Sequence, residues 1–330
     1  MLSTELLGVI EKGPLLSERV AFILQKEIKH FDNSIGKVVK DLYHDARNMD
    51  EERVKLMVEK NQESLLRAHQ GSTVSGVLVN MDLRDAWVFN LGDSSVAISH
   101  MNESQAGDLP YYNTLTQLHH ANTPAEYCIQ VLEHPPKEEF IKNGYIFGIS
   151  ELTRSLGDHH FKLPAKYVRR VLGCLPPRAQ FDYSGEYIKT PPYISSWADV
   201  GYVDLAKHED VKLFLFTDGV DDIVQWLHRP ADAPRTVKPA QIVAYLASTS
   251  PHAMSLAGNE LGHVICDYPN SNDGNQALDV LVNLLGGADT QRLGRVVDSE
   301  WLRQLRDPDW DDTKHIYIGD TTLIVCQFTW

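Results

Sequence analysis

The stretch that most constrains the fold is an apolar run that ends abruptly in an acidic turn, at residues 211–223. Residues 213–216 are all apolar, which is typical of a strand buried on both faces of a sheet. Asp218 and Gly219 follow after one threonine, so the strand should deliver a carboxylate to the rim of the sheet, where glycine lets the backbone turn. A buried carboxylate there needs a partner, and a divalent cation is the usual one. Asp218 also suits the N-cap of a helix, so this stretch alone supports both interpretations.

Composition limits the class of protein and its partners. The chain has 330 residues, of which 43% are hydrophobic and 23% charged, as expected of a globular protein with a large core. Its net charge of -14 argues against nucleic acid or an anionic membrane as the main partner. No apolar run approaches the length of about 18 residues that spans a membrane. Without a secretory signal, and with four scattered cysteines, we expect an intracellular protein of the cytoplasm or mitochondrial matrix.

Hydrophobic periodicity predicts the order of elements in the N-terminal third. Apolar residues at helical spacing predict helices at 17–28, 34–47 and 51–69, after a short apolar strand at 5–10. β-branched runs predict strands at 72–80, 86–91 and 96–99. The turns between these strands are too short for parallel crossovers, so we expect an antiparallel meander.

The rest of the chain alternates short helices with short strands. Helices are predicted at 123–132, 163–172, 218–227, 240–247 and 275–285, and strands at 144–150, 197–205, 211–216 and 323–328. Residues 251–272 are polar and contain glycine, asparagine and proline, so we expect an inserted surface segment there. No repeat, low-complexity tract or linker divides the sequence. We therefore expect a single domain over residues 1–330.

Several short motifs occur in an order that is similar to one known family. They are Gly71-Ser72-Thr73, Asn90-Leu91-Gly92-Asp93-Ser94, Thr153-Arg154-Ser155-Leu156-Gly157-Asp158 with Lys162, Thr190-Pro191-Pro192-Tyr193, Phe216-Thr217-Asp218-Gly219-Val220 and Asp320-Thr321-Thr322-Leu323-Ile324-Val325. The sequence resembles the PPM-type metal-dependent serine/threonine phosphatases, the type 2C class. It looks closest to the pyruvate dehydrogenase phosphatase-like branch.

The resemblance implies both a fold and a chemistry. The fold would be α+β, a central antiparallel β-sandwich flanked by helices, here lacking its first edge segment. In the family, two magnesium or manganese ions are held by aspartates, a glycine carbonyl and waters, and a metal-bridging water attacks phosphorus without a phosphoenzyme. Two cations would lower the pKa of the water, orient it and neutralise phosphate charge.

The first metal motif of the family is replaced in this sequence. Where the family has Asp-Gly-His after its strand, this chain has Glu11, Lys12 and Gly13. Glu11 keeps a carboxylate that is one methylene longer, which makes it a weak metal candidate. Lys12 puts an ammonium group at a cation's position, so we expect it to pair with Asp218 in place of the metal.

Two further metal positions also depart from the family pattern. Leu118 stands where the family has the third of its metal-linked aspartates, and an aliphatic side chain offers no ligand atom. Gly319 stands at the last ligand position, with Asp320 beside it. A one-residue slip would let Asp320 serve, although alternation along a strand aims it to the other side. Of the family's carboxylate positions, only Asp218 is clearly retained.

Other polar residues have less specific interpretations. Neighbouring residues on an extended chain point apart, so neither His119-His120 nor His159-His160 makes a metal site alone. A site using one histidine from each pair is the alternative to hydrogen-bonded or surface histidines. Arg154 could face an anion or form a structural ion pair with Asp158 or Asp93.

The replaced positions favour a pseudophosphatase, a binding or regulatory protein that needs no metal and recognises a protein partner. The rival hypothesis is an active phosphatase that hydrolyses phosphoserine or phosphothreonine in a phosphoprotein substrate. In that case Asp218, Glu11 and Asp320 would hold magnesium or manganese. A truncated reading frame is a third alternative, but it would not restore a ligand at Leu118 or Gly319.

Overall fold

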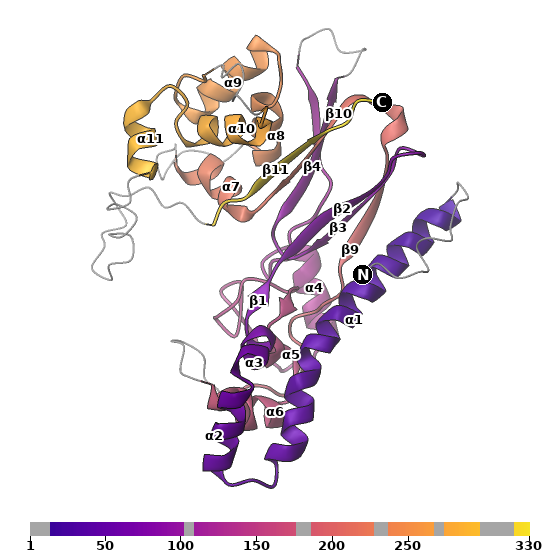
Figure 1. Ribbon diagram of the computed structural model, residues 1–330, viewed down its shortest axis with the longest axis vertical. Coiled ribbons are helices and arrows are strands. Elements are labelled where there is room, and N and C mark those ends of the chain that lie inside the picture. The colour runs from indigo at the N-terminus through magenta and orange to yellow at the C-terminus, as the bar shows by residue number, and fades with distance from the viewer. Residues whose placement is uncertain (1–13, 102–108, 176–185, 228–236, 267–273, 298–319) are drawn as a thin grey trace. The chain divides into compact units, whose positions relative to one another are not determined.

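The computed structural model describes residues 14–101, 109–175, 186–227, 237–266, 274–297 and 320–330 (Figure 1). Contacts within the chain define two compact units. Unit 1 comprises Met1–Ser94 and Gln117–Val203, and unit 2 comprises Ser95–Thr116 and Asp204–Trp330. That these units belong to a single domain stays a prediction.

The N-terminal helices of unit 1 differ in their boundaries from the prediction. The two helices predicted at 17–28 and 34–47 form one continuous helix, α1 (Pro14–Ala46), because no proline or glycine interrupts the residues between them. The helix predicted at 51–69 is divided into α2 (Glu51–Lys60) and α3 (Gln62–His69). Asn61 lies at the break, where its side-chain amide donates to the Met57 carbonyl at 2.8 Å and so competes with the helix backbone.

The first part of α1 packs on a three-stranded sheet. The sheet has the order β2-β3-β9, formed by Val74–Asn80, Asp85–Leu91 and Asp199–Asp204. β2 and β3 are antiparallel as predicted, and β9 lies at an edge, also as predicted. Leu16, Val20 and Leu24 of α1 are buried in a cluster with Trp87 of β3, whose indole N–H donates to the Ser17 carbonyl at 3.2 Å.

Short elements complete unit 1. They are β1 (Gly71–Ser72), α4 (Pro124–Glu133), β6 (Ile141–Lys142), β7 (Tyr145–Ile146), β8 (Leu156–Gly157), α5 (His159–Lys162), α6 (Ala165–Arg170) and a 3-10 turn, Leu172–Cys174. The strand predicted at 144–150 is short because Phe147 and Gly148 turn the backbone with φ values of 53° and 73°. β1 pairs with β8 and so joins two of the sequence motifs. Gly157 is required there, since a Cβ atom would lie 1.9 Å from the Gln70 carbonyl oxygen.

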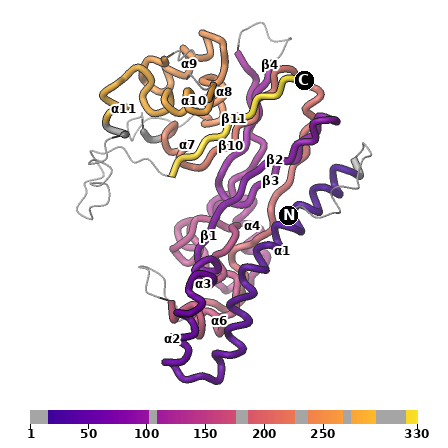
Figure 2. The backbone as a smooth tube through the Cα atoms, viewed as in Figure 1, coloured from indigo at the N-terminus to yellow at the C-terminus, as the bar shows by residue number. Residues whose placement is uncertain are grey.

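Unit 2 is built on a four-stranded sheet of order β11-β10-β4-β5. These strands are Leu323–Gln327, Glu209–Phe216, Ser95–Met101 and Tyr111–Thr114, and each neighbouring pair is antiparallel. The predicted meander is therefore wrong for its third strand, because β4 pairs with β10 and β5 rather than with β3. Residues 95–100 of β4 are all buried, which is the environment of a central strand. Figure 2 shows β11 running alongside β10, although the two strands are far apart in the sequence.

Five helices are described in unit 2, and all except α11 contribute to one apolar core with β10. They are α7 (Asp218–Asp222), which continues into a π turn (Ile223–Leu227), α8 (Pro239–Leu246), α9 (Pro251–Leu261), α10 (Gln276–Leu285) and α11 (Thr290–Val297), and a 3-10 turn (Leu205–Lys207) precedes β10. Phe214 and Phe216 of β10 are buried in a cluster with residues of α8, α9 and α10. Residues 251–261, predicted as polar surface, form α9 because small side chains such as Ala253 and Ala257 let it pack closely.

The predicted mixture of helices and antiparallel sheets is confirmed. The packing of the two main sheets into a sandwich stays a prediction, because they lie in different units. Among the helices that the structure describes, none is both long and apolar enough to cross a membrane.

Candidate functional site

The acidic turn after β10 has the predicted strand–turn–helix form. β10 ends at Phe216, and Asp218 is the first residue of α7. Thr217, rather than Asp218, occupies the N-cap position with extended dihedral angles. Asp218 itself is exposed. The expectation of a buried carboxylate at the strand tip was therefore wrong, and water can solvate this charge.

A second acidic residue lies next to this turn within unit 2. The Thr217 hydroxyl donates to the Asp320 carbonyl at 2.8 Å and accepts from the Thr322 N–H at 2.9 Å. Gly219 allows this close approach, because a Cβ atom there would lie 2.4 Å from the Thr321 hydroxyl oxygen. Asp320 is exposed, like Asp218. The structure thus brings together the segments that carry two of the three metal candidates.

Leu118 lies in unit 1, in a loop that is tied to the Gly92-Asp93 turn. The Asn90 side-chain amide donates to the Gln117 carbonyl at 2.8 Å, and the His119 N–H donates to the Gly92 carbonyl at 3.0 Å. Leu118 itself is 38% exposed. The loop therefore presents an aliphatic side chain where the resemblance places a carboxylate.

The other predicted site residues are not described by the structure. Glu11, Lys12, Gly13 and Gly319 lie outside the described residues. The Lys12–Asp218 pair accordingly stays a prediction.

At the described positions that the resemblance assigns to a magnesium or manganese centre, only some side chains supply donor atoms. Asp218 and Asp320 offer carboxylates, but Leu118 offers no ligand atom. Within the part of the chain that the structure describes, no group of three or more His, Cys, Asp or Glu side chains is arranged to hold a metal ion. No catalytic step through such ions can be derived from these residues.

Arg154 forms a structural ion-pair network, as one of its two interpretations predicted, but with different partners. Its guanidinium donates to both Glu126 carboxylate oxygens, at 2.6 and 3.1 Å, and to the Asp199 carboxylate at 2.7 Å. Burial opposes the charge, but the Glu126 hydrogen bonds and the charge of Asp199 outweigh it and raise the pKa of Arg154. The expected partners, Asp158 and Asp93, were wrong because α4 and β9 supply the carboxylates.

The two histidine pairs are held by hydrogen bonds, as the simpler interpretation predicted. His119 Nε2 lies 3.0 Å from the Asp199 carboxylate, and its Nδ1 accepts from the Gly92 N–H at 3.0 Å. The His119 hydrogen bond, helped by the charge of Arg154, lowers the pKa of Asp199 to about 2. His120 contacts Asp93 at 3.2 Å, and burial lowers the pKa of His160 to about 3.

Sequence reasoning missed a buried acidic residue on α1. Asp32 is 1% exposed, and its carboxylate accepts from the Lys162 ammonium at 2.9 Å and from the Gly157 N–H at 2.7 Å. Burial alone would raise the pKa of Asp32, but the His159 hydrogen bond and the charge of Lys162 lower it. The available signal was position, since Asp32 interrupts the apolar face of α1 three residues before Ile35.

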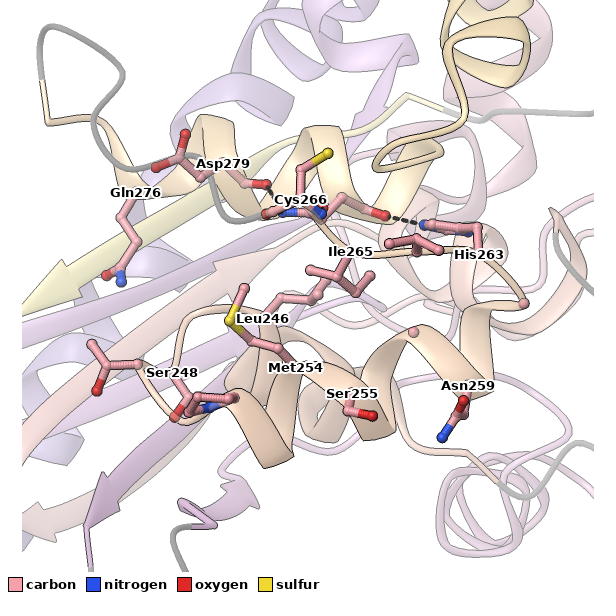
Figure 3. A pocket seen from close by; sticks show the side chains of 16 residues that line it. Leu246, Ser248, Met254, Ser255, Asn259, His263, Ile265, Cys266, Gln276 and Asp279 are labelled. Carbon is pink, nitrogen blue, oxygen red and sulfur yellow. Dashed lines mark hydrogen bonds between the residues drawn. The ribbon is translucent and has the colours of Figure 1, made fainter.

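A cavity of about 920 Å³ opens among α8, α9 and α10 in unit 2. Figure 3 shows Ser255 and Asn259 on the α9 side, facing the segment that carries His263 and Cys266. His263 Nε2 lies 2.7 Å from the Asn283 carbonyl, and the Asn283 side chain pairs with the Cys266 backbone at 2.9 and 3.0 Å. These polar groups thus hydrogen-bond to each other within the cavity wall. Of the predicted site residues that the structure describes, none lines the cavity.

The comparison with protein families agrees with the family that the motifs indicate. The family model described as protein phosphatase 2C matches residues 17–226, which is more than half of the chain. No curated protein sequence matches this chain.

The solved structures that match this chain have low sequence identity. A serine-threonine phosphatase 2C from Toxoplasma gondii is 15% identical, with a TM-score of 0.42, over 89% of this chain and 69% of that chain. A sex determining protein from C. elegans is 17% identical, with a TM-score of 0.35, over 68% of this chain and 46% of that chain. A PPM Ser-Thr phosphatase from Mycobacterium smegmatis, in complex with cacodylate, is 16% identical, with a TM-score of 0.26, over 69% of this chain and 71% of that chain.

Proposed function

The chain belongs to the protein phosphatase 2C family, and on this premise we propose that it is a pseudophosphatase, which keeps the scaffold to bind a protein partner and regulate it. Within the family, the likeness of residues 190–193 supports a place in the pyruvate dehydrogenase phosphatase-like branch. The proposed partner is a phosphoprotein or a protein that associates with one.

Leu118 is the observation that carries this proposal. The loop around it is hydrogen-bonded to Asn90 through Gln117 and to Gly92 through His119, and this loop carries an aliphatic side chain where the resemblance places a carboxylate. Replacing a carboxylate by an aliphatic side chain removes both the charge and the oxygen atoms that a hard cation requires. Lys12 would act in the same direction, because the resemblance places it at a metal position, where its ammonium group would repel a metal ion.

The alternative is an active magnesium- or manganese-dependent phosphatase. The hydrogen bonds of Thr217 favour it, because they hold the segments bearing two exposed carboxylates, Asp218 and Asp320, beside each other. Glu11 would be the third acidic ligand. This hypothesis requires that the ions bind although position 118 carries no carboxylate.

Manganese titration and turnover distinguish the two functions. We expect no manganese binding tighter than millimolar by calorimetry, and hydrolysis of a phosphothreonine peptide near background with or without manganese. Asp218→Asn is the decisive variant, and Asp210→Asn is its matched control, because Asp210 is an exposed aspartate near the other end of β10. Manganese-dependent turnover that is lost in Asp218→Asn but kept in Asp210→Asn would show that the protein is an active phosphatase.

A further inference from the structure

A small pocket in unit 1 has a lining rich in positive charge and hydrogen-bond donors. Its volume is about 170 Å³, and it lies between α1, α5 and residues 192–196. Three lysines line it, Lys29, Lys40 and Lys162, and Asn33, Ser195 and Ser196 add amide and hydroxyl groups. Such a lining suits an anion, because ammonium, amide and hydroxyl groups can all donate hydrogen bonds.

The charges around the pocket do not cancel. The only carboxylate among the described lining residues is Asp32, so three lysines against one aspartate leave two positive charges, His159 aside. Lys29 lies over the Trp197 ring at 5.3 Å from its centroid, which holds the ammonium group near the pocket without neutralising it. A positive pocket is a local exception on a chain whose net charge is -14.

One wall of the pocket is a buried and hydrogen-bonded part of the fold. The Lys162 side chain is 7% exposed, and its ammonium donates to Asp32 at 2.9 Å and to the Ser155 carbonyl at 2.7 Å. An ammonium group has three N–H donors, so one remains for a further acceptor. Gly36 lets α1 approach His159 closely, since a Cβ atom there would lie 2.4 Å from the His159 ring.

The size and donors of the pocket define the class of ligand. Drug-sized ligands and cofactors occupy about 300–1,000 Å³, so this pocket suits only a small group. Lysine ammonium groups bind phosphate as point charges, without the planar, bidentate geometry that arginine offers to phosphate and carboxylate alike. We propose that this pocket binds a phosphate group, supplied either by a phosphoserine side chain or by inorganic phosphate. This phosphate site does not depend on the proposed pseudophosphatase function, because none of the lining residues stands at a replaced metal position.

Calorimetry with three probes tests this proposal. The probes are inorganic phosphate, a phosphoserine peptide and the same peptide without phosphate, all with chelator present so that no metal site contributes. We expect saturable binding of a phosphate-bearing probe with a Kd below about 1 mM, and none of the unphosphorylated peptide. Tighter binding of the phosphopeptide would identify a phosphoprotein as the source, and equal binding would identify free phosphate.

Variants on α1 separate the pocket from general charge effects. The double variant Lys29→Gln/Lys40→Gln should weaken phosphate binding by about tenfold. Lys37→Gln removes one charge from the same helix. Lys37 is exposed, as Lys29 and Lys40 are, but it pairs with Asp41 at 2.6 Å and does not line the pocket, so binding should be unchanged. The proposal would be overturned if Lys37→Gln weakened phosphate binding as much as Lys40→Gln does. It would also be overturned if neither phosphate probe bound saturably.

Discussion

The pair formed by Asp32 and Lys162 makes a quantitative test of what holds unit 1 together. Both side chains are at least nine-tenths buried, at 1% and 7% exposure, and their charged atoms lie 2.9 Å apart. Replacing Lys162 by methionine keeps most of the side-chain volume but leaves the Asp32 carboxylate buried without its cation. Breaking a buried pair in this way costs about 3–5 kcal/mol.

Asp32 would keep part of its support in that variant. The Gly157 N–H still donates to its carboxylate at 2.7 Å. We therefore expect a loss near 3 kcal/mol, at the lower end of the general range of about 3–5 kcal/mol. Lys162→Met together with Asp32→Asn should cost about 1–3 kcal/mol less than the sum of the single changes, because the unpaired charge is then removed.

The exposed pair Lys37–Asp41 on the same helix is the matched control. Its side chains are 71% and 58% exposed, so the corresponding cycle of Lys37→Met and Asp41→Asn should show coupling of only about 0.3–0.5 kcal/mol. The free energy of unfolding is measured from urea denaturation of the four variants in each cycle. Equal coupling in the two cycles would refute the argument that burial makes the Asp32–Lys162 pair strong.

The same pair predicts a dependence on pH. The lowered pKa of Asp32 contributes stability that is present above its unfolded pKa and lost as pH falls through the folded pKa. Without Lys162, neither its charge nor its hydrogen bond lowers the pKa of Asp32, so in the variant the pKa is higher than in the wild type and the carboxylate takes up a proton at higher pH. The destabilisation by Lys162→Met should therefore shrink as pH is lowered from neutral. A difference between wild type and variant that stays constant with pH would contradict this mechanism.

Three further predictions use other contacts. Arg154→Met should destabilise unit 1 by about 3–5 kcal/mol, because it leaves Glu126, whose side chain is 6% exposed, without its bidentate partner. Thermal melting measures the loss, and Arg154→Lys should recover little of it because lysine cannot form the bidentate pair. Tyr193→Phe should cost about 1–3 kcal/mol in urea denaturation, since the hydroxyl donates to Glu138 and accepts two backbone N–H groups. Lys12→Met and Asp218→Asn should couple by less than about 1 kcal/mol, because Asp218 is exposed. Melting curves recorded with chelator measure this coupling, and a larger value would show that the two side chains form a strong pair.

Local patterns in the sequence determined most of the secondary structure and the family. The run at 213–216 followed by Asp218-Gly219 predicted β10 and α7, and β-branched residues before a short turn predicted the β2–β3 hairpin. These signals depend on side-chain periodicity and turn chemistry over a few neighbouring residues, so they survive without tertiary information. The motif order likewise indicated the family that the sequence match over residues 17–226 shows.

The tertiary structure alone decided which distant segments meet. β4 pairs with β10, which begins more than 100 residues later, and the Arg154 guanidinium finds its carboxylates 28 and 45 residues away. Lys162 lies 130 residues from Asp32 in the sequence, yet the fold buries the two together. Pairing and burial of this kind depend on how whole elements pack, and an aspartate looks the same in the sequence whether packing buries it, as with Asp32, or leaves it in water, as with Asp218.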